Sequence, residues 1–173
     1  MRFSAVFAVA SLAVAPVFAA SNQTLTDMAT LDSKAKDAQS AVKDYSGGLY
    51  SAYKVATAVY GAHQAAGAVR KSMAAEDEPF TSDQWPEYQK SSNSFCSTLS
   101  DTLDSAISKA ADIKNNGVFA FIAQGMISNL YNEKTAFQKQ VKSKLSEEQW
   151  KSLEPCSQKV DQKYKDAGAA FQN

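Results

Sequence analysis

The sequence predicts an all-α protein, a single domain folded as a bundle of about five helices, with the last helix kinked at Pro155. The main observation is that apolar residues recur every three or four positions from Thr24 to the C-terminus, which is the period of an amphipathic helix. No segment alternates apolar and polar residues as a strand does, and no repeat or flexible linker divides the chain. A chain of 173 residues can bury a sizeable core as one domain.

The N-terminus has the pattern of a secretory signal peptide. Arg2 provides a positive start, residues 3–14 form an apolar run, and Val17-Phe18-Ala19 offers apolar or small residues before a cleavage point. We therefore expect residues 1–19 to be a signal peptide, cut after Ala19 or Ala20, and residues 20–173 to be the folded domain. The apolar run is too short to span a membrane, and no later segment approaches that length. The mature protein is expected to be secreted.

Turn residues and caps separate the five expected helices. Ser46-Gly47-Gly48 should end the first helix, since glycine adopts the left-handed conformation that helix ends often need. Asn115-Asn116-Gly117 should end the third helix, and Ser146 to Gln149 has the spacing of a capping box for the last one. The helices are expected over residues 24–45, 49–74, 83–113, 118–145 and 146–171.

The second of these helices is unusually rich in alanine and glycine. Small side chains let a neighbouring helix approach closely, or they leave volume for a ligand, and the sequence leaves both interpretations open. The chain's single histidine, His63, lies in this helix without a second histidine or a cysteine at metal-binding spacing, which favours a structural role.

The fourth helix opens with ten apolar residues among the fourteen from Val118 to Tyr131. Phe119, Ile122 and Met126 share one stripe that should face the core, but Phe121 lies about 200° around the helix from Phe119. Phe121 is therefore either buried in a helix that is central in the bundle or exposed beside Val118 as an apolar tip. An exposed tip of this kind would suit docking on wax, cutin or polyester.

In a secreted chain the two cysteines, Cys96 and Cys156, are expected to form a disulfide; the alternative is two buried free thiols. Asn22 begins the sequon Asn22-Gln23-Thr24 and is the expected glycosylation site if the sequon is used.

Charge and motif content argue against several classes of function. Basic and acidic residues balance at 18 each, which gives no electrostatic footprint for nucleic acid. The sequence shows no nucleophile elbow, phosphate loop or metal-ligand cluster. Glu147 and Glu148 begin a helix, where carboxylates stabilise the first turn rather than act as an acid–base pair. We expect no catalytic residues, no cofactor and no metal.

The chain resembles the hydrophobic surface binding protein A family, secreted fungal proteins that include cell-wall galactomannoproteins. The resembling features run through most of the mature chain: Asp32, Tyr45-Ser46-Gly47-Gly48, the alanine-rich helix with His63, Thr102-Leu103-Asp104-Ser105 with Lys109, Gly117, and Leu130 with Phe137. The resemblance implies an all-α secreted domain that binds hydrophobic surfaces or lipids. It also implies fatty acids as ligands and a secreted esterase or cutinase as a partner. The cysteine pair and the abundance of aromatic residues depart from what the resemblance leads us to expect.

Two further functions stay open: a secreted inhibitor or adhesion module that acts on another protein, and a structural wall protein with no small ligand. The lipid-binding interpretation expects an apolar slot between the second and fourth helices. The expected slot residues are Val55, Val59, Ala62, Ala66, Phe119, Ile122 and Met126, with Val118 and Phe121 at the tip.

Overall fold

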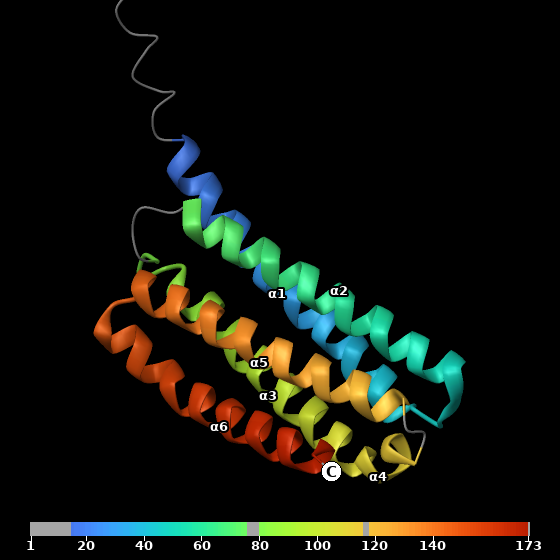
Figure 1. Ribbon diagram of the computed structural model, residues 1–173. Helices are drawn as coiled ribbons and strands as arrows, with labels where there is room; N and C mark the ends of the chain where they lie inside the picture. The colour runs from blue at the N-terminus through green and yellow to red at the C-terminus, as the bar shows by residue number, and fades with distance from the viewer. Residues whose placement is uncertain (1–14, 76–79, 116–117, 173) are drawn as a thin grey trace, which may run out of the picture.

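A computed structural model describes residues 15–75, 80–115 and 118–172; the side chains of residues 15–21, 118 and 119 lie outside this description. These residues form an all-α fold without strands. Figure 1 shows the helices stacked side by side as one bundle. The helices are α1 (Ala15–Lys43), α2 (Gly48–Ala75), α3 (Trp85–Ser108), α4 (Ala110–Lys114), α5 (Val118–Lys144) and α6 (Glu147–Phe171).

Three pairs of helices form the most extensive contacts. α1 and α2 make a tight antiparallel hairpin, and α3 packs against both α1 and α6. α5 lies alongside α6 and makes fewer contacts with α2. The bundle therefore has a well-packed side, built from α1, α3 and α6, and a looser side between α2 and α5.

The expected third helix, residues 83–113, is interrupted, and so the described residues hold six helices rather than five. The interruption lies at Lys109, whose amide is shared between the carbonyls of Ser105 and Ala106 at 3.2 Å each. Such a shared bond tightens the final turn of a helix. α4 then restarts the chain for only five residues. The hydrophobic period continues across the break, which explains why the sequence predicts one helix here.

The expected helix ends at Gly47 and Ser146 are confirmed. Gly47 and Gly48 both have left-handed backbones, with φ of +88° and +78°, and this turns the chain from α1 into α2. At the start of α6 the Ser146 hydroxyl accepts the Gln149 amide at 3.2 Å, and the Gln149 side chain accepts the Ser146 amide at 3.0 Å. The capping box is complete. The expected turn at Asn116 and Gly117 lies outside the described residues.

Pro155 lies inside α6, which runs without interruption from Glu147 to Phe171. The expected kink at this proline stays a prediction. Proline has no amide hydrogen, so the helix lacks one backbone bond at this point. The apolar side of α6, with Trp150, Leu153 and Val160, stays buried on both sides of the proline.

The core consists of two groups of buried side chains. One lies where α1, α2, α3 and α6 meet and includes Met28, Leu31, Val69 and Tyr88. The other lies between α3 and α6 and contains the Cys96–Cys156 disulfide, with an S–S distance of 2.08 Å. The expected disulfide is confirmed.

α1 begins at Ala15, upstream of the expected cleavage point, so the start of the mature chain at Ala20 or Ser21 stays a prediction. Asn22 is exposed on α1. Among the described residues, every helix is too short or too polar to cross a lipid bilayer.

The disulfide closes a loop of 60 residues, and in the chain-entropy model such a link stabilises the fold by about 4 kcal/mol. Replacing both Cys96 and Cys156 by serine should lower the melting temperature by roughly 8–16 °C, because about 1 kcal/mol shifts a chain of this size by 2–4 °C. Intact-mass analysis of the unmodified protein should show the loss of two hydrogens. Two freely alkylatable thiols would contradict the pairing.

Candidate functional site

Two hydrogen bonds fix how α2 and α5 lie beside each other. His63 Nδ1 on α2 lies 2.5 Å from Glu133 Oε2 on α5, and Gln140 Nε2 on α5 donates to the Arg70 carbonyl on α2 at 2.6 Å. In both contacts the partners are 70 residues apart in the sequence. The helices therefore run parallel, with each α2 residue level with the α5 residue 70 positions later. Figure 1 shows the same parallel course.

A cavity of about 260 Å³ lies between α2 and α5 and reaches down to the rest of the bundle. We call it the slot. The α2 wall consists mostly of small apolar residues, Ala52, Val55, Ala56, Val59, Ala62, Ala66 and Gly67. The α5 wall carries larger ones, Ile122, Met126, Ile127, Leu130 and Phe137. Large side chains thus face small ones across a space that neither helix fills.

The floor of the slot comes from the well-packed side of the bundle. α1 and α3 contribute apolar residues to it, Leu31, Ala35, Ala38, Val42, Phe95, Leu99, Leu103 and Ala106. One end of the slot is bounded by Tyr45, Lys109, Ile113 and Phe171, and Arg70 lies at the other. The slot follows α2 from Ala52 to Arg70, a length of about 27 Å at 1.5 Å per residue.

Six of the residues expected to line the slot lie on its walls. Val55, Val59, Ala62 and Ala66 lie on the α2 wall, and Ile122 and Met126 lie on the α5 wall. The side chains of Val118 and Phe119 lie outside the described residues. Whether any of these residues binds a lipid stays a prediction.

Phe121 is not buried in the slot or the core; its side chain is 79% exposed. The structure therefore selects the second of the two alternatives that the sequence leaves open. α5 is not a central helix, because it contacts α6 on one side and only lightly contacts α2 on the other. Its remaining face, which carries Phe121, is open.

The expectation that the α5 stripe faces a filled core is wrong for its N-terminal half. Ile122 is exposed and Met126 is partly exposed, and both line the slot, whereas Val141 near the C-terminal end of α5 is buried. The physical reason is the composition of α2. Alanine and glycine opposite these residues are too small to cover them.

The contact between His63 and Glu133 is a feature of the site that the sequence does not indicate. Both side chains are 42% exposed at the edge of the slot, and together they join its two walls. His63 thus has the expected structural role, with a carboxylate partner that lies 70 residues away. No group of three or more metal-ligating side chains occurs in the described parts of the chain.

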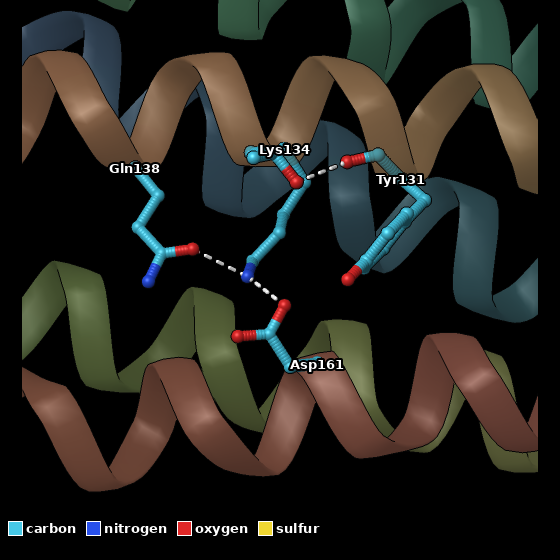
Figure 2. Close-up of polar contacts among 5 residues, drawn as sticks. Tyr131, Lys134, Gln138 and Asp161 are labelled. Atoms are coloured by element: carbon cyan, nitrogen blue, oxygen red, sulfur yellow. Dashed lines mark hydrogen bonds and ion pairs between the residues drawn. The ribbon is translucent and has the colours of Figure 1, made fainter.

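A second polar contact holds α5 to α6. The Lys134 ammonium pairs with the Asp161 carboxylate and donates to Gln138 Oε1 at 2.5 Å. Figure 2 shows the Lys134 and Gln138 side chains pointing from α5 toward Asp161 on α6. Lys134 lies at the slot wall and is only 12% exposed, but Asp161 already neutralises its charge. The cations at the ends of the slot, Arg70 and Lys109, have no ion pair in the part of the chain that the structure describes.

This arrangement is suited to holding an apolar chain. The walls are almost entirely hydrocarbon, and polar groups occur at the edge and ends. Ligand pockets in proteins are commonly apolar with a few placed polar groups.

The hydrophobic surface binding protein A family model matches residues 21–143. The chain belongs to this family. No curated protein sequence matches the chain significantly.

Solved structures of similar fold come from proteins of low sequence identity. The crystal structure of AfMP4p in complex with palmitic acid is 12% identical, with a TM-score of 0.80 over 88% of this chain and 99% of that one. Ligand binding domain 2 of the Penicillium marneffei MP1 protein, complexed with multiple arachidonic acids, is 14% identical, with a TM-score of 0.75 over 90% and 96%. Domain 1 of the same protein, complexed with arachidonic acids, is 13% identical, with a TM-score of 0.66 over 86% and 95%. At these identities the comparison establishes the shared fold.

Tyr164 on α6, which also lines the slot, predicts a pH dependence of the stability of the fold. Burial raises the pKa of the Tyr164 phenol above its ordinary value, and the nearby Glu133 carboxylate raises it further. The phenol therefore ionises near pH 10 in the unfolded chain but only at higher pH in the folded one. The unfolded state then binds fewer protons than the folded state, so stability falls as the pH rises through 10.

Tyr164→Phe should remove this loss, and the variant should show a shallower decrease in denaturation midpoint between about pH 9.5 and 11 than the unmodified protein. Urea unfolding at a series of pH values measures the slope. The exposed Tyr50→Phe variant is the control and should keep the original slope. Identical slopes in all three proteins would contradict the role assigned to Tyr164.

Proposed function

We propose that this protein binds a single-chain amphiphile, such as a fatty acid, in the slot between α2 and α5, and that it does so without catalysis. The observation that carries the proposal is the apolar slot itself, with small residues on one wall and large ones on the other. The fatty acids in the three structures of similar fold support the same class of ligand.

The dimensions of the slot suit such a ligand. The hydrocarbon core of a bilayer, two acyl chains end to end, is about 30 Å thick, so one chain spans about 15 Å. A slot of about 27 Å along α2 exceeds this length. Arg70 and Lys109 lie at its two ends, and either cation can form an ion pair with an acidic headgroup.

The expected affinity follows from the buried tail. Each methylene removed from water contributes about 0.8 kcal/mol, so a tail of about fourteen contributes roughly 11 kcal/mol. Lost translational and rotational freedom removes at least about 4 kcal/mol of this. The remainder, no more than about 7 kcal/mol, corresponds to a dissociation constant of roughly 10 μM or weaker.

Family membership supports a wider role at hydrophobic surfaces, and the exposed Phe121 is a suitable contact for one. Secretion, location at the cell wall and recruitment of an esterase or cutinase belong to this proposal. The inhibitor or adhesion alternative differs in its ligand. A titration with palmitate separates the two, because only a lipid-binding protein should show saturable uptake and thermal stabilisation.

We expect palmitate at 100 times its dissociation constant to stabilise the fold by about 2.7 kcal/mol, which corresponds to roughly 5–11 °C in melting temperature. The measurement is a thermal melt across a palmitate titration. Sodium acetate, which has the carboxylate but no hydrocarbon tail, is the control and should not shift the melting temperature. No shift with either compound would contradict the proposal.

Ala62→Leu and Ala66→Leu should each fill part of the slot and weaken palmitate binding by at least tenfold, because the added carbons occupy the space of the tail. Each melting temperature should stay within a few degrees of the parent, since both side chains border open space. Ala68→Leu is the matched control, because Ala68 is exposed on the same helix and is not part of the slot wall. If the Ala62 and Ala66 variants bind palmitate as the parent does, the ligand lies elsewhere.

A further inference from the structure

Five apolar or aromatic side chains are exposed where α2 and α5 begin. Leu49, Tyr50 and Tyr53 on α2, with Phe121 and Ile122 on α5, are between 47% and 79% exposed. We call these five residues the mouth patch. Together they include most of the large hydrophobic side chains that are exposed in the described residues, with Tyr60 the remaining one.

The register of the two helices brings the members of the mouth patch to one end of the bundle. With a constant offset of 70 residues, Phe121 is level with Ser51 and Ile122 is level with Ala52. Leu49, Tyr50 and Tyr53 lie within two residues of these levels. Figure 1 shows the first turns of α2 and α5 near each other at the same end.

The mouth patch is continuous with the slot. Ile122 belongs to both, because it is exposed and also lines the slot. Ala52, between Tyr50 and Tyr53, lies on the α2 wall. An apolar object that covers the mouth patch therefore lies next to side chains that line the slot.

The two walls are also least restrained at this end. The hydrogen bonds at His63 and Arg70 join α2 to α5 in the middle and at the far end. No hydrogen bond or ion pair joins the first two turns of the two helices within the described ranges. Separation of the walls at the mouth patch therefore breaks no such bond.

The chemistry of the mouth patch matches a membrane interface. Tyrosine places an apolar ring and a polar hydroxyl at the boundary between hydrocarbon and water, and leucine, isoleucine and phenylalanine enter the acyl region. The Lys54 ammonium lies 4.6 Å from the centre of the Tyr50 ring, where it can meet the phosphate of a lipid headgroup. In an aqueous environment, fatty acids long enough to fill the slot reside mainly in membranes and other lipid aggregates, because exposing each methylene to water is unfavourable.

We propose that the mouth patch docks on a fluid phospholipid membrane and that the ligand passes directly between the membrane and the slot. This inference rests on the proposed function, since it assigns the source of the slot's ligand. It predicts transfer by collision, in which the protein loads or unloads only while it is docked. The alternative route is release of the ligand into water followed by capture.

Transfer of a fluorescent fatty acid from the loaded protein to phosphatidylcholine vesicles separates the two routes. With stopped-flow detection, the transfer rate should rise in proportion to vesicle concentration. A rate that does not depend on vesicle concentration would overturn the proposal, because it would show release into water.

The variant Tyr53→Ser/Phe121→Ser should transfer the fatty acid at least fivefold more slowly, with the dissociation constant of the fatty acid changed less than twofold. Its melting temperature should stay close to that of the parent, since both side chains are exposed. The control is Tyr60→Ser, which removes an exposed tyrosine of α2 away from the mouth patch and should transfer at the parent rate. Equal rates for all three proteins would overturn the proposal.

Flotation of the unloaded protein with phosphatidylcholine vesicles tests docking without any ligand in the slot. The parent should float with the vesicles, and the Tyr53→Ser/Phe121→Ser variant should remain at the bottom of the gradient. If the protein floats but binds no fatty acid, the proposed function fails while docking stands. If it binds fatty acid but does not float, docking fails, and the mouth patch is left as a contact for a protein partner.

Discussion

The small side chains along α2 are the constraint on which the rest of the site depends. A bundle normally fills the space between neighbouring helices with interlocking side chains at close to crystal density. On the face of α2 toward α5, alanine and glycine predominate, so the large residues of α5 meet no partner of matching size. The result is a slot on one side of an otherwise well-packed fold. Larger residues on α2 would close it and give an ordinary core.

An open space of this kind persists only if the helices around it are held from elsewhere. The tight α1–α2 hairpin holds one wall, and the Lys134–Asp161 ion pair holds the other wall to α6. The Cys96–Cys156 disulfide joins α6 to α3, which forms part of the floor. Each wall is thus attached to the well-packed side, and the contact between the walls is left to His63, Glu133 and the Gln140 side chain.

Features that depend on local sequence could be predicted, and features that depend on distant partners could not. Periodicity and caps predict the helices and their ends, because hydrophobic faces, Gly47 and Ser146 act within a few residues. The break at Lys109 could not be predicted in this way, since the hydrophobic period continues through it. The exposure of Phe121 depends on how α5 packs in three dimensions, and so periodicity alone could not decide whether this side chain is buried or exposed.

The candidate site shows the same limit. The contrast between a small-residue helix and a large-residue helix predicts six of the residues on the slot walls. The Glu133 partner of His63 is 70 residues away, and a single sequence contains no signal for that pairing. The sequence also does not reveal that Leu49, Tyr50 and Tyr53 lie at the same end of the bundle as Phe121, because this follows from the parallel register of α2 and α5.

The central claim is that an acyl chain occupies the space between α2 and α5. The most direct test is isotope-filtered NMR of the protein bound to carbon-13-labelled palmitate, with contacts detected between ligand methylenes and protein methyl groups. An acyl chain in the slot should give contacts to the methyls of Ala62, Ala66 and Met126 and none to Ala68, which is exposed on α2 outside the slot wall. Contacts to Ala68 without contacts to Ala62 and Met126 would contradict it.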